Sequence, residues 1–390
     1  MKPVRITLVA PLAWMGAYHR RLLNGFAAYA RLHLWTLTVV NPDSLRQLAG
    51  LDRHADGLIL MPHPLVDEFA RPFKCPAVCL SGAVADAPWP IVKTDDVAVG
   101  RLAAQHLIER GFRRLAFVGE YSASWWAIQR QRGFFERAGE AGLECAECGT
   151  PASARRRKPS PRAASREIAI AKWIATQPLP MGVMGCNDYW GARVIAACQA
   201  MNLKVPGDVA VIGVDDDDLH VEICNPPLSS IPHQYDRLAH EAAELLRRLI
   251  AGEAPPDRPV LIAPGALVVR QSSDTTASHD PLVAEAARFI RQHLAEATGV
   301  KDLLGELAVS RSLLDQRFHQ MLGRSAAEEI RRARIERARQ LLAGSDLPTP
   351  LVASQSGFSS AWQFSKTFRR ETGKTPTEYR RLFRIRGNGR

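Results

Sequence analysis

The sequence contains no apolar run long enough to cross a bilayer as a helix, which takes about 20 consecutive apolar residues. Its first ten residues lack the long apolar region of a secretory signal and are instead typical of a first β-strand. We therefore expect a protein of the cytoplasm that has no membrane among its partners.

Cysteine is sparse, with 7 residues scattered over 390. Cys145 and Cys148 form one Cys-x-x-Cys pair without a second pair, and no histidine flanks Cys75 or Cys79. A structural zinc ion needs four such ligands. The pattern favours reduced, structural thiols, and we expect neither a metal ion nor another cofactor.

The motifs of the common catalytic centres are also missing. There is no Gly-x-Ser-x-Gly elbow, no complete Gly-x-x-x-x-Gly-Lys-Ser/Thr phosphate loop and no His-Glu-x-x-His zinc motif. These absences argue against an enzyme. The lack of a secretory signal argues against a second alternative, a binding protein that serves transport.

Positive charge is unevenly distributed along the chain. The net charge is +11, and the residues from His279 onward hold 20 Lys/Arg and 12 Asp/Glu, or +8. Only +3 remains for the first 278 residues. A basic C-terminal module on a nearly neutral body is typical of a protein that binds the phosphate backbone of a nucleic acid, although a solvated basic surface is the simpler alternative.

Residues 1–278 alternate short apolar runs with amphipathic helical stretches. Apolar strands separated by helices indicate parallel sheets that are covered on both faces. The runs form two sets, which predicts two α/β lobes joined by crossing segments near residues 91–96 and 229–233. A ligand cleft is expected between the lobes, at the carboxyl ends of the strands. The predicted strands are Val4–Ala10, Leu34–Val40, Gly57–Met61 and Ala77–Leu80 in the first lobe, and Leu115–Gly119, Gly182–Cys186 and Val209–Val214 in the second.

Two polar segments mark boundaries. Residues 151–166 are rich in Pro, Ser and Arg and read as a surface loop or, alternatively, as a basic contact arm. The small polar residues from Gln271 to Ser278 are typical of a linker. We therefore divide the chain into a ligand-sensing domain (1–272), a linker (273–280) and a C-terminal all-α domain (281–384).

A helix-turn-helix pattern occurs twice in the C-terminal domain, at residues 307–318 and 356–370. In each copy a phenylalanine is followed five residues later by a glycine: Phe318 and Gly323 in the first, Phe368 and Gly373 in the second. A recognition helix places its N-terminal side chains on base edges while neighbouring basic residues hold phosphates. A helix over about residues 326–342 would connect the two units, so that they enter adjacent major grooves roughly 34 Å apart.

The second copy carries a specific signature. Gly357-Phe358, Phe364, Phe368-Arg369-Arg370, Gly373, Thr375-Pro376 and Tyr379-Arg380 resemble the AraC/XylS transcription regulators. The resemblance covers about residues 281–384 and implies binding to repeated half-sites in double-stranded DNA. Transferred by position, it assigns phosphate contact to Arg311 and base contacts to Ser312, Asp315 and Gln316 in the first unit, and to Ala361, Trp362, Gln363 and Lys366 in the second.

The body resembles the type I periplasmic-binding-protein fold used by lactose-repressor-like regulators. The resemblance is carried by residues 94–96 with Gly100, by residues 186–188 and by residues 213–216. Arg130, three residues before Gly133, falls where relatives place a ligand-binding arginine. The N-terminal DNA-binding segment of that family is not expected here, because the first strand begins almost at residue 1.

A polyol ligand would account for the polar residues of the expected cleft. Vicinal hydroxyls can bridge a carboxylate or a guanidinium, and the apolar faces of sugars stack on indole rings. The alternatives are that Asp215 is a simple cap, that the tryptophans are core and that residues 18–20 are only a first helical turn. The predicted ligand-binding residues are Tyr18, His19, Arg20, Trp125, Trp126, Arg130, Asn187 and Asp215.

Ala17-Tyr18-x-Arg20, residues 211–216 and Pro376-x-Glu378-Tyr379-Arg380 are similar to the bacterial xylose-operon regulators. His19 departs from the acidic residue expected in that family. The resemblance implies a sugar-responsive, homodimeric transcription activator of pentose genes, with D-xylose as effector, RNA polymerase as partner and a place on the nucleoid. The alternative is the same DNA-binding regulator responding to another sugar, a nucleoside or another small polar metabolite.

Overall fold

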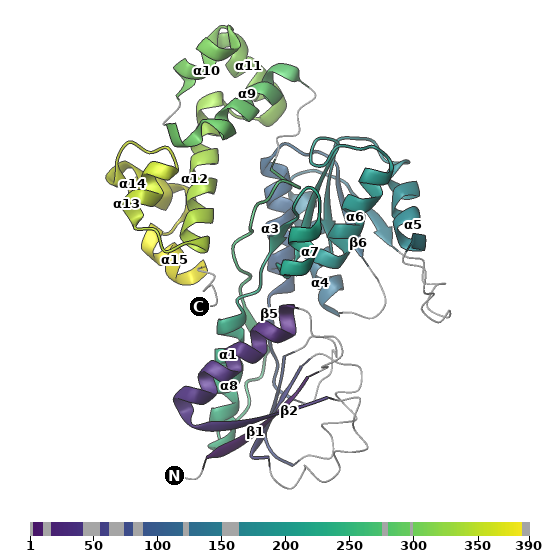
Figure 1. Cartoon of the computed structure of the whole chain (residues 1–390), viewed down its shortest axis with the longest axis vertical. Coiled ribbons are helices and arrows are strands. Elements are labelled where there is room, and N and C mark those ends of the chain that lie inside the picture. The colour runs from purple at the N-terminus through teal and green to yellow at the C-terminus, as the bar shows by residue number, and fades with distance from the viewer. Residues whose placement is uncertain are drawn as a thin grey trace.

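The computed structural model describes residues 3–10, 17–41, 55–61, 74–80, 89–119, 125–149, 164–274, 280–296 and 299–383. The chain forms two α/β lobes and a helical C-terminal domain that lies beside lobe 2 (Figure 1). Within these residues no helix is both long and apolar enough to span a membrane. The predicted basic loop at 151–166 falls largely outside the described residues.

Lobe 1 is a parallel four-stranded sheet of order β2-β1-β3-β4, and α1 and α8 pack on it and on each other. The strands are almost wholly buried, apart from the edge strand β2. The two helices approach closely at Gly25, where a Cβ atom would lie 2.6 Å from the Cβ of Ala239. The elements are β1 (Val4–Val9), α1 (Ala17–His33), β2 (Trp35–Val40), β3 (Gly57–Leu60), β4 (Ala77–Cys79) and α8 (Tyr235–Ile250).

Lobe 2 is a parallel five-stranded sheet of order β10-β9-β8-β6-β7. Its largest buried side chains, Phe112, Phe117 and Phe134, belong to one cluster that joins the sheet to the helices. The elements are α3 (Asp96–Glu109), β6 (Leu115–Gly119), α4 (Trp125–Glu140), β7 (Cys145–Gly149), α5 (Ala164–Ile174), β8 (Met181–Gly185), α6 (Asp188–Ala200), β9 (Val209–Val214), α7 (Asp218–Ile223) and β10 (Ser229–Ile231).

Three segments cross between the lobes. The two that the sequence predicts, near residues 91–96 and 229–233, contain β5 (Val92–Thr94) and β10. A third leaves lobe 1 through β11 (Val260–Ile262), which pairs with β5, and reaches lobe 2 where Val268 bridges Ser230.

The predicted linker starts while the chain is still packed on lobe 2. Ser272 and Ser273 are fully buried. The Ser272 hydroxyl donates to the carbonyl oxygen of Val211 at 2.7 Å, and the Ser273 hydroxyl donates to the Ser229 hydroxyl at 2.8 Å. Asp280 then caps the first helix of the C-terminal domain.

The C-terminal domain consists of two helical units that share one long helix, α12. One cluster of buried residues joins α9–α11 to the first half of α12, and a second joins its other half to α13–α15. At 19 residues α12 is about 28 Å long, so it sets the separation of the two units. The elements are α9 (Pro281–Gln292), a 3₁₀ turn (Leu294–Glu296), α10 (Val300–Leu307), α11 (Arg311–Leu322), α12 (Ala326–Gly344), α13 (Thr349–Gln355), α14 (Ala361–Thr372) and α15 (Pro376–Phe383).

Contacts through Arg324 and Ala266 join the C-terminal domain to the two-lobed body. The Arg324 guanidinium, just before α12, donates to the carbonyl oxygen of Glu109 at the end of α3. Ala266, in the third crossing segment, packs against the buried cluster of the second helical unit. The segment that links the lobes therefore also contacts the C-terminal domain.

Candidate ligand pocket and nucleic-acid interface

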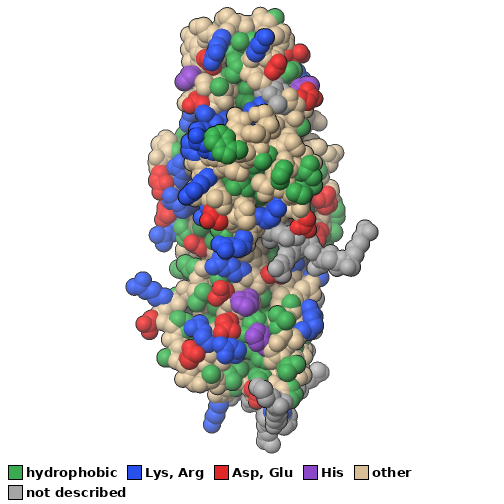
Figure 2. All heavy atoms as spheres, turned by 90° about the vertical axis from the view of Figure 1, so that its left-hand side faces the viewer, with side chains coloured by type: hydrophobic (Ala, Val, Ile, Leu, Met, Phe, Trp, Pro, Cys, Tyr) green, Lys and Arg blue, Asp and Glu red, His purple; other side chains and the backbone are tan. Residues whose placement is uncertain are grey.

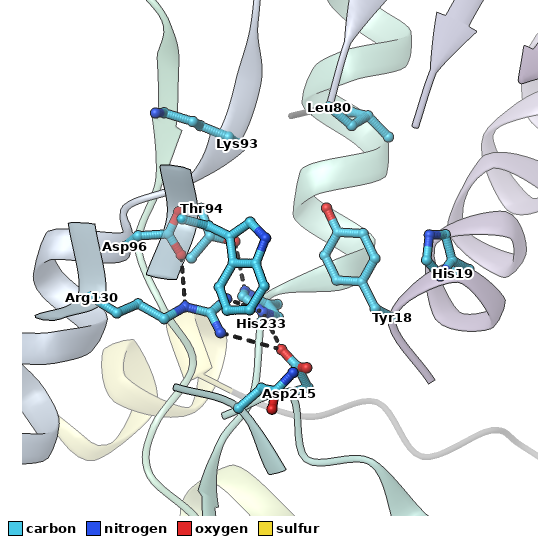
Figure 3. Close-up of a pocket in the computed structure, with 11 residues that line it drawn as sticks. Tyr18, His19, Leu80, Lys93, Thr94, Asp96, Arg130, Asp215 and His233 are labelled. Atoms are coloured by element: carbon cyan, nitrogen blue, oxygen red, sulfur yellow. Dashed lines mark hydrogen bonds and ion pairs between the residues drawn. The ribbon is translucent and has the colours of Figure 1, made fainter. Parts of the chain in front are cut away.

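A pocket with a cavity volume of about 200 Å³ lies between the lobes (Figure 3). Lobe 1 contributes the first turn of α1 and the residue after β4, while lobe 2 contributes residues at the starts of its helices and after its strands. This is the location expected for a ligand in parallel α/β units. The pocket is lined by Tyr18, His19, Leu80, Lys93, Thr94, Asp96, Trp126, Arg130, Asn187, Asp215 and His233.

Arg130 is the best-anchored side chain of the pocket and is only 4% exposed. Its Nε donates to Asp96 Oδ1 at 2.9 Å and its Nη1 donates to the carbonyl oxygen of Cys186 at 2.7 Å. Burial disfavours the guanidinium charge, but Asp96 and Asp215 outweigh that effect and the pKa of Arg130 is raised. Figure 3 shows the guanidinium held between these carboxylates.

Two glycines place Arg130 and Asp96 side by side. A Cβ atom on Gly100 would lie 1.9 Å from the carbonyl oxygen of Arg130, and one on Gly133 would lie 2.0 Å from that of Val97. Only glycine permits α3 and α4 to pack this closely. Gly100 and Gly133 therefore allow the close helix packing that brings Asp96 and Arg130 together in the pocket.

His233 and Asp215 form the opposite side of this polar cluster. His233 Nε2 lies 2.9 Å from Asp215 Oδ1, and its Nδ1 lies 2.7 Å from the hydroxyl of Thr94. Asp215 has a φ of 105°, a conformation that is unfavourable for a residue with a Cβ atom. Its backbone is fixed there by two hydrogen bonds, from its N–H to Ile231 and from the Tyr235 hydroxyl to its carbonyl oxygen.

Tyr18 closes the pocket from lobe 1. Its ring contacts those of His233 and Tyr235 edge-on, with centroids 5.4 and 5.9 Å apart. Burial, with help from Asp96 and Asp215, raises the pKa of the Tyr18 hydroxyl, so it remains a hydrogen-bond donor at neutral pH.

An ion pair also joins the two lobes. Arg21 Nη2 of α1 donates to Asp218 Oδ1 of α7 at 2.9 Å, and its Nη1 lies 4.0 Å from Asp216 Oδ2. The pair is partly exposed, so its own contribution to stability is small, on the order of 1 kcal/mol or less. It nevertheless distinguishes this arrangement of the lobes from a more open one.

The second candidate site is formed by α11 and α14, which are built alike. Each has 12 residues, a serine N-cap and a glycine C-cap in the left-handed conformation, with φ of 70° and 71°. The serine hydroxyls accept from the N–H groups of Leu313 and Gln363. The structure therefore contains two copies of the same cap-to-cap helix, one on each side of α12.

Most residues that the sequence assigns to DNA lie on the outer faces of these helices. Arg311, Ser312 and Gln316 are exposed on α11, and Trp362, Gln363 and Lys366 on α14, while Ala361 is half-buried. Trp362 is 73% exposed, and Lys366 Nζ lies 5.1 Å from the centre of its ring. The exposed indole ring can contribute apolar contact area to a partner that covers this surface.

Asp315 is the exception on α11. Its Oδ1 accepts from the backbone N–H of Ala326 at 3.2 Å, and its Oδ2 lies 3.6 Å from Arg311 Nε. The side chain therefore caps the start of α12 and joins the first helical unit to the connecting helix. This structural role competes with the predicted base contact.

Basic side chains surround these helices. Figure 2 views the molecule from the side on which α13 and α14 lie in Figure 1, and shows a run of Lys and Arg side chains over the upper part of this face. Such a surface attracts a phosphate backbone without reading its sequence. Among the described residues no group of three or more His, Cys, Asp or Glu is placed to hold a metal ion.

Comparison with known proteins agrees with this two-part organisation. Residues 104–273 match the model of a periplasmic binding protein-like domain, and residues 303–382 match that of a helix-turn-helix domain. The chain combines a periplasmic-binding-protein-like domain with an AraC-type helix-turn-helix domain. This is the organisation of a DNA-binding transcription regulator.

Relatives share this organisation over almost the whole chain. The xylose operon regulatory protein of Escherichia coli (strain K12) is 27% identical over 381 residues, covering 93% of this chain and 94% of the relative. That of Haemophilus influenzae is 26% identical over 379 residues, covering 93% and 95%. The solved structure of a xylose-binding transcription activator superposes with a TM-score of 0.63 at 25% identity, covering 99% of this chain and all of that one.

The periplasmic-binding-protein-like domain brings most of the predicted ligand-binding residues together. Six of them line the pocket: Tyr18, His19, Trp126, Arg130, Asn187 and Asp215. Trp125 and Arg20 do not line the pocket. Trp125 directly precedes the lining residue Trp126, and Arg20 directly follows the lining residue His19. Residues 18–20 lie in the first turn of α1, and two of them, Tyr18 and His19, also line the pocket. The two alternatives for this segment, a first helical turn and a part of the pocket, are therefore compatible. That these side chains bind a sugar stays a prediction.

Sequence reasoning missed five residues of the pocket: Leu80, Lys93, Thr94, Asp96 and His233. Most of them belong to crossing segments or directly follow one. Thr94 and Asp96 were part of a stretch that the sequence singled out, but as a sign of fold only. His233 ends the second crossing segment. A polar residue at the end of a predicted crossing segment could have indicated that it lines the cleft.

Proposed function

We propose that the protein is a sugar-responsive transcription factor that binds specific DNA sites through its helix-turn-helix domain. The observation that carries the proposal is the duplicated helix of the C-terminal domain, with Ser310 and Gly323 bounding one copy and Ser360 and Gly373 the other. Two similar helices on one connecting helix of about 28 Å suit adjacent major grooves on one face of a duplex, roughly 34 Å apart.

The exposed side chains of α11 and α14 suggest which residues contact bases and which contact phosphates. Gln316 on α11 and Gln363 on α14 can hydrogen-bond to base edges, since a glutamine amide matches adenine in the major groove. Arg311 is 70% exposed in its side chain and is suited to phosphate. Trp362 offers an apolar surface for a thymine methyl group.

The pocket supports a polyol as effector. Asp215 and Arg130 provide a carboxylate and a guanidinium, groups that vicinal hydroxyls bridge, and Trp126 provides an aromatic face. The relatives are named for the xylose operon, which makes D-xylose the first sugar to test and pentose catabolic genes the first candidate targets.

Regulation would proceed through the arrangement of the lobes. A sugar that contacts both lobes binds the closed arrangement more tightly, and it shifts the equilibrium only by that difference in affinity. The third crossing segment, which contacts the helix-turn-helix domain at Ala266, can pass the shift to the DNA-binding units. We further propose a homodimer on repeated half-sites that recruits RNA polymerase as an activator, in the cytoplasm and on the nucleoid, with no catalytic role for the pocket.

A mobility-shift assay with DNA from the genomic neighbourhood, repeated with D-xylose and other sugars, tests the proposal. Specific retardation that a sugar strengthens supports it, and failure to bind any fragment counts against it. The same regulator with a different small polar effector is the second candidate. Lys93 in the pocket favours it, because no neutral pentose requires an ammonium group.

A further inference from the structure

Lys93 is the one charged side chain of the pocket that has no ion-pair partner among the described residues. It lies on β5, lines the pocket and is half-buried. Its nearest recorded contact is the ring of Trp125, whose centroid lies 6.0 Å from the Lys93 Nζ, at the outer limit of a cation–π interaction. A half-buried ammonium group that faces a pocket can donate charge-assisted hydrogen bonds to an anionic group of a ligand.

The other charged groups of the pocket are already engaged with one another. Asp96 Oδ1 accepts from Arg130 Nε at 2.9 Å, and Asp215 Oδ1 lies 2.9 Å from His233 Nε2 and 3.8 Å from Arg130 Nη1. One oxygen of each carboxylate is thus engaged in the cluster formed by Arg130, Asp96, Asp215 and His233. Figure 3 shows Lys93 above this cluster, outside the network of dashed contacts.

Several groups of the pocket can still donate a hydrogen bond to a ligand, beside Asp96 Oδ2 and Asp215 Oδ2, which can accept one. Asn187 uses its side-chain oxygen to accept from the N–H of Trp190, which leaves its amide N–H groups for a ligand. The Tyr18 hydroxyl keeps its proton, and the Lys93 ammonium can only donate. Each hydroxyl of a neutral sugar brings a donor with every acceptor, whereas a carboxylate brings acceptors only.

We propose that the effector is a sugar carboxylate, an aldonate or uronate of five or six carbons, whose carboxylate binds Lys93 while its hydroxyls bind the Arg130–Asp215 cluster. The inference rests on the proposed function and specifies the chemical class of the effector. One unpaired ammonium matches the single charge of a carboxylate. A sugar phosphate carries up to two charges and more acceptor oxygens, which calls for more donors than Lys93 provides.

Binding to matched acid and neutral sugars tests the inference. The full chain is titrated calorimetrically with D-xylonate against D-xylose, with D-glucuronate against D-glucose, and with D-ribose 5-phosphate. We expect one acid to bind at least about 10-fold more tightly than its neutral partner, as a charge-assisted hydrogen bond predicts. Lys93→Met should remove that preference, so that the acid and its neutral partner bind with affinities within about 2-fold of each other.

Two further variants control for general damage. Lys93→Arg keeps the charge and should keep the preference for the acid. Lys74→Met removes a lysine that is exposed and does not line the pocket, and it should change neither affinity. Loss of the preference in Lys74→Met, or retention of it in Lys93→Met, would overturn the assignment to Lys93.

The outcomes also separate this inference from the proposed function. Equal or tighter binding of D-xylose or D-glucose overturns the acidic effector but leaves a sugar-responsive regulator in place. Tightest binding of D-ribose 5-phosphate overturns the carboxylate. Binding of none of the five compounds overturns the inference and counts against a sugar as effector.

Discussion

The carboxylate of Asp215 and the imidazole of His233 lie 2.9 Å apart, and this contact joins the end of β9 to the segment that leaves β10 for lobe 1. Both side chains line the pocket. A ligand that binds Asp215 therefore acts on a residue in a segment that crosses between the lobes. Through this contact, effector binding at Asp215 can directly influence the arrangement of the lobes.

Replacement of Asp215 should uncouple sugar from DNA. Asp215→Asn keeps the side-chain shape and tolerates the φ of 105°, because asparagine adopts positive φ more readily than most residues. Loss of the charge should weaken effector binding at least about 10-fold, measured by calorimetry, while DNA affinity without effector stays near wild type. The exposed carboxylate of Asp236 serves as control, and Asp236→Asn should change neither. An equal fall in DNA affinity with and without effector would show that Asp215 is structural.

Gln316 and Arg311 should differ in what they contribute to DNA binding. Gln316→Ala should relax base preference at one position by about 1–3 kcal/mol, because it removes a base contact. Arg311→Ala should weaken binding to all sequences and reduce the slope of log K against log salt by about 1. Binding assays over a panel of site variants at several salt concentrations separate the two effects. Indistinguishable behaviour of the two variants would contradict the assignment.

Asp315 should matter for stability more than for base choice. Asp315→Ala removes the acceptor for the backbone N–H of Ala326, and loss of such a cap costs about 1 kcal/mol. Urea unfolding of the full chain measures the loss, with Ser312→Ala, an exposed change on the same helix, as control. Altered base preference at unchanged stability would instead support the base contact that the sequence predicted.

Glu329 should make the stability of the helix-turn-helix domain sensitive to acid. The carboxylate is 2% exposed and accepts from Arg324 at 2.6 Å and from Arg332 at 2.7 Å. Burial acts to raise the pKa of Glu329, but the two guanidinium groups outweigh it and lower that pKa to about 2. Because the folded-state value lies below the unfolded one, the stabilisation is complete above about pH 4.5 and is lost as the pH falls toward 2.

Glu329→Gln should therefore lower the free energy of unfolding by about 3–5 kcal/mol at pH 7, since it leaves two arginines without a counter-charge. The difference from wild type should shrink at pH 4 and again at pH 3, as followed by urea unfolding. Glu306→Gln, at an exposed position that forms no ion pair with any described residue, should behave like wild type at each pH. A difference that is independent of pH would mean that packing, and not charge, accounts for the effect.

Local pattern was sufficient to predict the main elements of the fold. The seven predicted strands agree with the structure to within one residue at each end, because all but the edge strand β2 are mainly buried apolar runs. The strand at Trp35 starts one residue later than predicted, because Leu34 has a φ of 55°. The sequence did not predict β7, an edge strand of the lobe 2 sheet, or β5, β10 and β11, which are three residues long and depend on pairing with distant strands.

The candidate site was predictable where it depends on local structure. Asn187 and Asp215 follow strands and Arg130 precedes a glycine that allows two helices to touch, so their places could be inferred. Trp125 and Trp126 are neighbours on α4 and point about 100° apart, and pattern alone could not decide which one faces the pocket. Lys93 lies on a crossing strand, and its orientation depends on how the lobes are placed.

Titration of the full chain against DNA fragments from its own genomic neighbourhood, with and without the matched sugars, tests most directly whether one polypeptide both reads DNA and senses a sugar. We predict specific binding to at least one fragment, with an affinity that changes at least about 5-fold at saturating effector. Binding to no fragment in either condition, or binding that no effector alters, would contradict that claim.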